Sequence, residues 1–372
     1  MNRDLVVLSL EPWDDVWRRN QYLVDGLLRA DPTLRVLFVE PSNDLLHSVV
    51  AGRGINRGRG LRIADGYAGR LSLFQPDKVL PRFAGPAADA LLRRDVRRAV
   101  TRAGLVEPVL WVNDPSWAGL VARTGWPSLY DMTDDWLAAD RGERELRRIA
   151  ANEAVLMRRC RTVVVCSTGL FDTRNEERSV VLIPNAVDVA RYRVPHDRPA
   201  DLPERSALYV GTLHEDRLDV DLVLRTADAA ASASGSVVLV GPSALAAANV
   251  DRLAAHPAVA LLGPKAFTDV PAYLQHAAVL IVPHIVDAFT DSLDPIKLYE
   301  YLAVGRPVVS TPVAGFRTLA SDSLTVADAA AFPDAVSALL ADPAPSVVVE
   351  DVPDWKDRVA AYVEVLAPLR AE

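Results

Sequence analysis

One stretch, Asp294-Pro-Ile-Lys-Leu-Tyr-Glu-Tyr-Leu-Ala-Val-Gly-Arg-Pro-Val-Val-Ser-Thr311, predicts a helix followed by a buried strand. Asp294 is a favourable N-cap residue, Pro295 suits the first helical position, and Gly305 favours the helix end. The apolar run after Pro307 is typical of a strand inside a parallel sheet. Helix–strand units of this kind build doubly wound α/β domains.

The same alternation fills the chain in two series. The first has strands at 5–10, 35–39, 109–112, 128–130, 162–165 and 180–183, and helices at about 20–29, 86–102 and 143–158. The second has strands at 207–210, 237–240, 258–262, 279–282 and 307–310, and helices at 219–232, 270–276, 295–304, 332–341 and 355–368. Prolines and charges between the two series are typical of a linker.

We therefore predict an N-terminal Rossmann-like domain at 1–190, a linker at 191–205 and a C-terminal Rossmann-like domain at 206–348. A C-terminal helix within 349–372 is expected to pack back towards the N-terminal domain. Ligands of such sheets bind at the carboxyl ends of the strands. We expect the two domains to face each other across a cleft at those ends.

Composition excludes several classes of protein. The 372 residues carry a net charge of −8, which argues against nucleic acid as the main partner. Cys160 and Cys166 are too few for a disulfide framework, and we expect them to be reduced and buried in a cytoplasmic protein. The first apolar run is too short for a signal peptide, and none approaches the roughly 18 residues of a membrane span. The histidines lack zinc-ligand spacing, so no metal site is predicted.

The start of the predicted helix at 295–304 can bind an anion, because helix N-termini offer N–H groups and a positive dipole end. Lys297 in its first turn can reach the same anion, and Glu300 lies one turn later on a similar side. A carboxylate there can accept two hydrogen bonds from a ribose diol. The alternative is an ordinary amphipathic helix with an Asp cap and an i,i+3 Lys–Glu pair. The local pattern leaves both interpretations open.

Several motifs together resemble the GT-B glycosyltransferases of family four. The 294–311 stretch resembles their donor-binding segment. Four other segments resemble further motifs of these enzymes, namely Ile183-Pro-Asn-Ala-Val-Asp188, Tyr209-Val-Gly-Thr-Leu213, Val238-Leu-Val-Gly-Pro242 and Leu261-Leu-Gly-Pro-Lys-Ala-Phe267. Two further segments resemble those of a bacterial subgroup that builds exopolysaccharide or teichuronic-type polymers. They are Trp13-Asp14, with Arg19 and Gln21, and Tyr130-Asp-Met-Thr-Asp-Asp-Trp136.

The resemblance implies a GT-B fold and a nucleotide-sugar donor in the C-terminal domain. Glu300 would bind the ribose, and Lys297 and Arg217 would stabilise the leaving diphosphate. The other implied donor contacts are Ser292, Asp294, Pro295, Ile296, Gly211, Thr212, His214, Leu262, Gly263 and Lys265. Many family members carry an acidic residue seven positions before this glutamate, where this chain has Leu293. That departure leaves the sugar open.

The resemblance also implies the reaction. A hexose-type sugar would pass from a UDP-, GDP- or dTDP-linked donor to a hydroxyl on a glycan, a lipid-linked intermediate or a small natural product. Transfer would retain configuration and need no metal and no further cofactor. Candidate acceptor residues are Trp13, Asp14, Trp17, Arg19, Asn113 and Asp134, with Asp14 also a catalytic candidate. The alternative for the loop tryptophans is packing against their own domain.

A basic stretch lies between Arg53 and Arg102, where eleven arginines and one lysine face only four aspartates. It is expected to contact an anionic membrane at its inner face or to receive a phosphorylated or lipid-diphosphate acceptor. A solvated helix face is the simpler alternative.

Two rival functions stay open, and a third lacks its sequence motif. A nucleotide-sugar epimerase or hydrolase would use the same fold and donor but no acceptor. A non-catalytic glycosyltransferase-like partner subunit would keep the fold alone. A nicotinamide dehydrogenase needs Gly-x-Gly-x-x-Gly after a strand, and the sequence has no such run.

Overall fold

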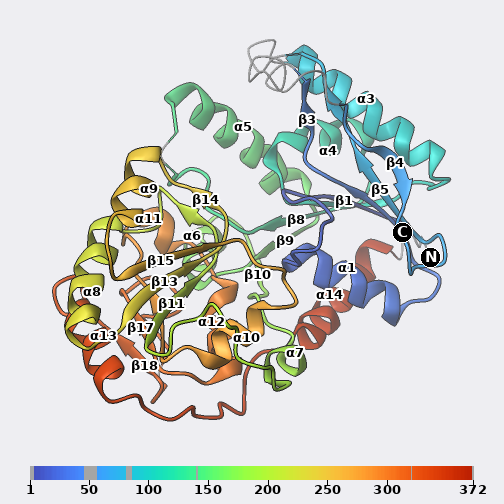
Figure 1. Ribbon diagram of the computed structural model, residues 1–372. Helices are drawn as coiled ribbons and strands as arrows, with labels where there is room; N and C mark the ends of the chain where they lie inside the picture. The colour runs from blue at the N-terminus through green and yellow to red at the C-terminus, as the bar shows by residue number, and fades with distance from the viewer. Residues whose placement is uncertain (1–3, 46–56, 81–85, 140, 320, 371–372) are drawn as a thin grey trace. The chain divides into compact units, whose positions relative to one another are not determined.

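The computed structural model describes residues 4–45, 57–80, 86–139, 141–319 and 321–370. The chain divides into two compact units. The first runs to Pro184 and takes in the C-terminal segment from Trp355, and the second is Asn185–Asp354 (Figure 1). Each is an α/β unit built around one large, mostly parallel sheet.

The sheet of the first unit has eight strands. Their spatial order is β10 (Val181–Leu182), β9 (Thr162–Val165), β8 (Ser128–Met132), β7 (Val109–Val112), β1 (Asp4–Leu8), β2 (Arg35–Val39), β5 (Leu71–Gln75) and β4 (Gly60–Ile63). All neighbouring pairs are parallel except β4 with β5. A small separate pair joins β3 (Asn43–Asp44) to β6 (Asp77–Lys78).

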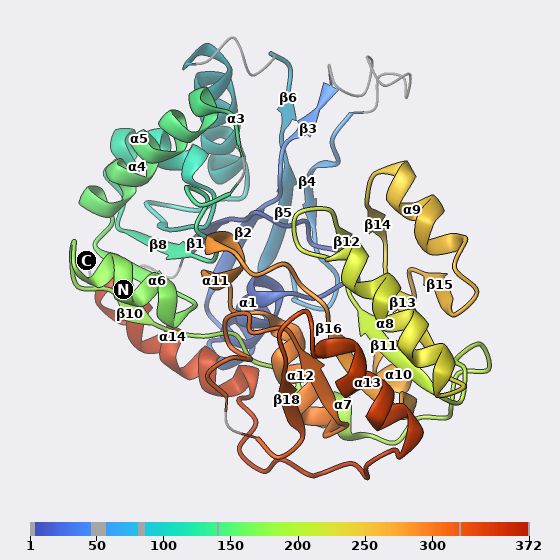
Figure 2. The same ribbon diagram turned by 90° about the vertical axis from the view of Figure 1, so that its left-hand side faces the viewer.

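Helices cover both faces of this sheet because its central strands are apolar on both sides. One layer contains α3 (Pro86–Arg102), α4 (Ala118–Thr124), α5 (Glu143–Arg159) and α6 (Thr168–Asn175), with a 3-10 turn at Pro115–Trp117. Figure 2 shows α3, α4 and α5 grouped together. The other layer pairs α1 (Arg19–Ala30) with α14 (Trp355–Arg370). There Tyr362 of α14 stacks on Trp111 of β7 at 4.6 Å between ring centroids.

The sheet of the second unit has six parallel strands. Their order is β15 (Val259–Gly263), β13 (Ser236–Val240), β11 (Ser206–Val210), β16 (Val279–Val282), β17 (Val308–Ser310) and β18 (Leu324–Val326). A short pair, β12 (Leu213–His214) with β14 (Ser243–Ala244), follows β11 and β13. The strand order reverses at β11, as in doubly wound folds.

Two cores lie on the two faces of this sheet. Along β11, Ala207 and Tyr209 face one core and Leu208 the other, as the two-residue period of a strand requires. The first core is closed by α8 (Val220–Ser232), α9 (Ala247–Ala254) and α13 (Phe332–Ala341). The second is closed by α7 (Val189–Arg193), α10 (Val270–His276) and α12 (Ile296–Val304). The short α11 (Ala288–Asp291) follows β16.

The boundary between the units differs from the predicted linker at 191–205. The second unit starts at Asn185, because α7 and the buried side chain of Tyr192 belong to its core. It ends at Asp354 rather than at 348. Prolines and charges in the sequence do not show the point where the chain leaves one core for another.

Cys160 and Cys166 are both buried, as predicted. Within the described ranges, no helix combines the length and apolarity that a bilayer-spanning segment needs.

Candidate active site

The candidate site in the second unit begins at the start of α12. Pro295 is the N-cap residue, and no side chain of the described part of the chain caps this helix. The Leu298 N–H donates to the Pro295 carbonyl oxygen at 3.0 Å, while the N–H groups of Ile296 and Lys297 come before any carbonyl of the helix itself, at its positive dipole end. Such a helix start favours an anion.

The prediction that Asp294 is the N-cap was wrong by one residue. Its carboxylate accepts hydrogen bonds from the backbone N–H of Asn185 at 2.5 Å and from the Tyr299 hydroxyl at 2.8 Å. The side-chain amide of Asn185 donates in turn to the Asp294 carbonyl oxygen at 2.6 Å. Asp294 therefore links the loop before α12 to Asn185 and to Tyr299 of the same helix.

Lys297 lies in the first turn of α12 and reaches the end of β11. Its Nζ is 3.8 Å from the centroid of the Tyr209 ring. A Cβ placed on Gly211 would come within 3.3 Å of the same Nζ. Burial lowers the pKa of Lys297 to about 7, while Glu300 opposes the shift and Arg217 adds to it. The ammonium therefore lies beside a backbone turn, in a place where water compensates it poorly.

Glycines end three adjacent strands next to this lysine. Gly211 and Gly241 have φ of 144° and 143°, and Gly263 has φ of 67°, all in a region that favours glycine. Backbone hydrogen bonds link them in series, from Gly211 N–H to the Val240 carbonyl and from Gly241 N–H to the Gly263 carbonyl, both at 2.9 Å. Gly241 was considered only as part of the Val238–Pro242 motif, yet in the structure Gly241 packs against the turn at Gly211.

Replacing Gly241 by alanine should destabilise the second unit and displace this turn. A Cβ there would lie 2.0 Å from the Gly211 carbonyl oxygen, so backbone must move. The unfavourable φ adds about 1–2 kcal/mol. Gly263→Ala is the matched control, because its φ is also positive but nothing lies within 4 Å of the added Cβ. Thermal unfolding should show a clearly larger loss for Gly241→Ala. Equal losses would mean that the close approach of Gly211 does not matter.

Glu300 follows one turn after Lys297 and meets α7. Its Oε1 accepts a hydrogen bond from the buried Tyr192 hydroxyl at 2.5 Å. Burial raises the pKa of Glu300, whereas that hydrogen bond and the charges of Lys297 and Arg191 oppose the rise. No other described residue is hydrogen-bonded to this carboxylate, so Oε2 can accept from a ligand. Tyr192 escaped sequence reasoning, because nothing local connects it to a residue more than a hundred positions away.

Three more polar side chains lie within electrostatic reach of Lys297, namely Arg217, His214 and His284. Burial lowers the pKa of both histidines, and the charges of Arg217 and Lys297 lower each further. Both rings are therefore neutral near pH 7, and Nε2 of His284 lies 3.1 Å from the Tyr209 hydroxyl. The guanidinium of Arg217 stands 5.3 Å from the centroid of the Phe289 ring. Its Nε is buried without a hydrogen-bond partner in the described ranges. The positive charge available to a ligand here therefore comes from Arg217 and Lys297.

Residues 204–342 match the family described as group 1 glycosyl transferases. Residues 204–342 are called the group 1 domain below. The chain is also similar to a protein of Bacillus subtilis (strain 168) named as a teichuronic acid biosynthesis glycosyltransferase, TuaH. The two are 24% identical over 218 residues, which is 54% of this chain and 55% of the relative. The alignment thus spans about half the length of that relative.

Solved structures extend the similarity to the whole chain. Sucrose-phosphate synthase from Thermosynechococcus elongatus is 18% identical with a TM-score of 0.72, covering 100% of both chains. The α,α-trehalose-phosphate synthase (UDP-forming) from Burkholderia vietnamiensis is 13% identical with a TM-score of 0.64, over 100% of this chain and 99% of that one. AviGT4, a glycosyltransferase involved in avilamycin A biosynthesis, is 16% identical with a TM-score of 0.57, over 99% and 98%. These likenesses confirm the predicted GT-B fold with its two Rossmann-like domains.

The group 1 domain brings together only part of the predicted donor set. Lys297, Gly211, His214 and Arg217 meet near the start of α12, where Pro295 and Ile296 lie, and Glu300 is one turn away. Thr212 contributes its carbonyl oxygen, which accepts from the Tyr209 hydroxyl at 3.4 Å. These contacts leave the ligand roles of the individual residues as predictions.

Other predicted donor residues are engaged elsewhere in the group 1 domain. Lys265 forms an ion pair with Asp201 at 2.6 Å and lies over the Tyr273 ring. The Ser292 hydroxyl donates to the Phe289 carbonyl oxygen at 2.7 Å, within the α11 turn. Leu262 packs against the core beneath the sheet. A sequence pattern places such residues near a strand end, but it does not show which partners their side chains contact.

In the first unit, the tryptophans of the loop after β1 pack against aromatic neighbours. The Trp13 ring centroid lies 5.1 Å from that of Phe38 and 6.0 Å from that of Tyr67. Trp17 contacts Tyr22 edge to face at 5.2 Å. Both tryptophans fit the packing alternative, and both stay partly exposed. Their contact with a sugar stays a prediction.

Arg19 and Asn113, two of the predicted acceptor residues, both bind the buried Asp131. Arg19 is only 4% exposed, and its guanidinium donates to both carboxylate oxygens of the buried Asp131 at 3.2 and 3.3 Å. It also donates to the Tyr362 hydroxyl at 2.9 Å. Asn113 donates to the Asp131 carboxylate at 3.0 Å. A buried carboxylate needs such partners, so both side chains are consumed in stabilising the interior.

Carboxylates gather where β1 and β8 end. Burial raises the pKa of Glu11 to about 7; Arg18 opposes this, while Asp134 and Asp14 add to it. Asp14 also accepts from the backbone N–H of Val16 at 3.1 Å, in a local turn. Glu11 was not predicted as a site residue, because the sequence does not show that this carboxyl group is buried. Asp14 and Asp134 are thus within electrostatic reach of a third acid in the first unit.

Proposed function

We propose that this chain moves a hexose-type sugar from a nucleotide-diphosphate-sugar to a hydroxyl acceptor. The observation that carries the proposal is the meeting of Lys297 with Gly211 and the uncapped start of α12, with Glu300 one turn further on. A diphosphate requires cations and N–H donors, and a ribose diol requires an acceptor such as a carboxylate. One helix turn of the group 1 domain offers all three.

In the proposed reaction, the acceptor oxygen bonds to the anomeric carbon while the bond from that carbon to the diphosphate oxygen breaks. The departing diphosphate takes the acceptor proton, so a retaining reaction needs no protein base. Lys297 and Arg217 stabilise the negative charge that develops on the leaving group. Glu300 holds the ribose, and positioning of the two substrates contributes the rest.

The names of relatives support the class of acceptor. TuaH is named for teichuronic acid biosynthesis and AviGT4 for avilamycin A biosynthesis. We propose a hydroxyl on a glycan, a lipid-linked intermediate or a small natural product. The proposed contacts are Asp14, Trp13, Trp17 and Asp134 of the first unit. Asp14, the proposed catalytic carboxylate, accepts a hydrogen bond from the acceptor hydroxyl and orients it, while the proton goes to the departing diphosphate.

A binding screen with the purified chain tests the donor proposal. UDP, GDP, dTDP and NAD are titrated in a calorimeter or a thermal-shift assay. We expect clear binding of one nucleoside diphosphate. No response to any diphosphate, or a response to NAD alone, would overturn the proposal. If the matching nucleotide-sugar is consumed without an acceptor, the chain is an epimerase or hydrolase. If it binds but is never turned over with any acceptor, the chain is a partner subunit.

Sugar transfer should persist in excess EDTA. The proposed leaving-group stabilisation comes from Lys297, Arg217 and the helix start, and these groups need no divalent ion to bind a diphosphate. The rate of nucleoside diphosphate release is measured with EDTA and with added Mg²⁺. Complete loss in EDTA, restored by Mg²⁺, would contradict the metal-independent mechanism.

We propose a cytoplasmic location for this reaction, which rests on the two buried cysteines, Cys160 and Cys166. Contact of the basic stretch 53–102 with an anionic membrane also stays a prediction. Residues 53–56 and 81–85 of that stretch lie outside the described residues.

A further inference from the structure

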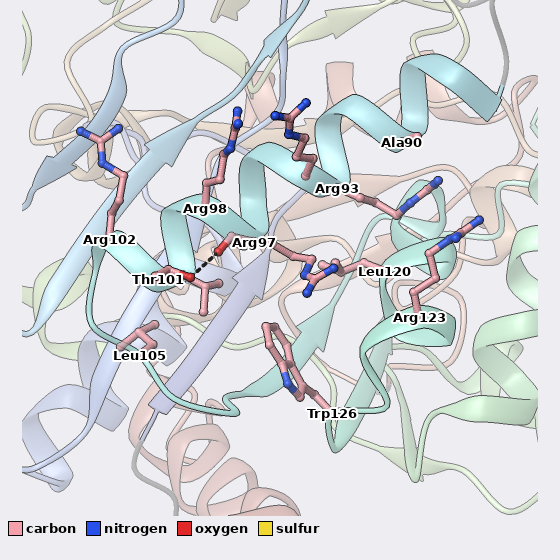
Figure 3. A pocket seen from close by; sticks show the side chains of 12 residues that line it. Ala90, Arg93, Arg97, Arg98, Thr101, Arg102, Leu105, Leu120, Arg123 and Trp126 are labelled. Carbon is pink, nitrogen blue, oxygen red and sulfur yellow. Dashed lines mark hydrogen bonds between the residues drawn. The ribbon is translucent and has the colours of Figure 1, made fainter.

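The first unit contains a hollow of about 930 Å³ between α3 and α4. Arginines dominate its lining, namely Arg93, Arg94, Arg97, Arg98, Arg102 and Arg123. Five come from α3 and one from α4. In Figure 3, Arg93 and Arg97 extend from α3 towards α4, and Arg123 rises from α4 beside them. Two helices thus aim guanidinium groups into one space.

These charges are poorly balanced by the protein itself. Arg98 has an exposed partner in Asp95 at 3.5 Å. Within the described ranges, the other five arginines form no hydrogen bond or ion pair with a carboxylate. Burial lowers the pKa of Arg93, the charge of Arg123 lowers it further, and Asp89 opposes both. Five of these arginines are exposed and Arg93 is half-buried, so the group of like charges is accessible to an anion from solution, which would reduce their mutual repulsion.

The hollow also holds Arg93 in place and has apolar walls. A Cβ on Gly119 would come within 2.8 Å of Arg93 Nη1, so the guanidinium rests on the first turn of α4, where a larger side chain would displace it. Leu105, Leu120 and Trp126 line the same hollow. A ligand that fills it therefore meets guanidinium groups together with hydrocarbon and an indole ring.

We propose that this hollow binds the phosphate or diphosphate group of a ligand that also carries an apolar part. Guanidinium groups bind phosphate oxygens through paired hydrogen bonds, and several of them together suit a diphosphate. The apolar walls suit a chain attached to that group. Both a lipid headgroup and a free phosphate compound carry such a phosphate group.

This site is distinct from the proposed transfer site. Leu105 and Trp126 stand before β7 and β8, at the amino ends of these parallel strands. Asp14 and Asp134, the proposed acceptor carboxylates, follow the carboxyl ends of β1 and β8, at the opposite edge of the sheet. The arginine hollow also belongs to a different unit from α12. It does not depend on the proposed transferase activity.

Paired variants test the proposal. Arg97→Gln with Arg123→Gln removes two charges from the hollow. Arg144→Gln with Arg158→Gln removes two charges from exposed positions of α5 in the same unit, so the net charge matches. All proteins also carry Lys297→Ala, to keep the α12 site from contributing. Pyrophosphate binding is measured by calorimetry, and vesicles of phosphatidylcholine with or without phosphatidylglycerol are measured by co-sedimentation. Thermal unfolding checks that each variant folds.

We expect the Arg97/Arg123 pair to weaken binding about tenfold or more, equivalent to about 1.4 kcal/mol, and the α5 pair to leave it nearly unchanged. Binding of phosphatidylglycerol vesicles alone identifies a lipid headgroup, whereas pyrophosphate binding as well identifies a soluble phosphate ligand. Absence of binding to both probes would overturn the proposal. Equal loss in the two double variants would also overturn it, since that is the behaviour of diffuse charge. Neither result bears on nucleotide binding at α12, which is measured separately with Lys297 intact.

Discussion

Glu300→Ala should abolish useful donor binding while leaving the fold intact. Its carboxylate is the ribose acceptor in the proposed complex, and hydrogen bonds to a charged group contribute about 1.5–3 kcal/mol each. Losing both bonds to a diol predicts a nucleoside diphosphate Kd at least about 100-fold weaker. The Tyr192 hydroxyl loses its hydrogen bond to this carboxylate as well, and the Lys297 ammonium loses the charge that opposes its deprotonation. Isothermal titration with the preferred nucleotide measures the effect.

Two further variants separate this role from general damage. Glu300→Gln keeps the size of the side chain and one acceptor oxygen, so we expect an intermediate Kd. Glu350→Ala makes the same deletion at an exposed position of the second unit and should leave the Kd unchanged. Burial raises the pKa of Glu300, so its charge is costly to the folded state, and its removal should move the melting midpoint by only a few degrees. Wild-type affinity in Glu300→Ala would show that the donor site is misplaced.

The fold could be predicted from the sequence wherever a strand is apolar on both faces. Strands 35–39, 109–112, 162–165 and 279–282 were predicted with the bounds of β2, β7, β9 and β16. Strands β4 and β5 were missed: β4 is the edge strand and β5 is its neighbour, both lie within the arginine- and glycine-rich stretch, and both are only partly buried. Periodicity reports burial, and edge strands have little of it.

The site was predictable only where a motif fixes a backbone. The helix start at 295–296 and the turn at Gly211 depend on local geometry, and the structure brings Lys297 close to both. Side chains whose partners come from distant elements were not predictable. Tyr192 with Glu300 and Arg19 with Asp131 depend on contacts across more than a hundred residues.

Lys297→Ala should lower turnover by about 10²–10³-fold, the effect of removing one preorganised donor from a developing anion. Its pKa of about 7 also predicts a pH dependence. The ammonium is charged below that pH and loses its proton as the pH rises through it, so affinity for the diphosphate should fall on the alkaline side. Binding a diphosphate favours the charged form, so the complex should take up a proton when it forms near pH 8. Calorimetry in two buffers of different ionisation enthalpy detects that uptake.

Lys297→Arg decides whether this lysine is the titrating group. A guanidinium stays charged across the whole range, so the alkaline loss of affinity and the proton uptake should both disappear, even if arginine binds the diphosphate less well. Titration of the nucleotide's own phosphate is common to both proteins and cancels in the comparison. His214 and His284, whose pKa values are lowered, are neutral in this range and cannot supply the same profile. If Lys297→Arg keeps the wild-type pH profile, the proton belongs to another group, and leaving-group stabilisation must then be assigned to Arg217 and the amides of α12.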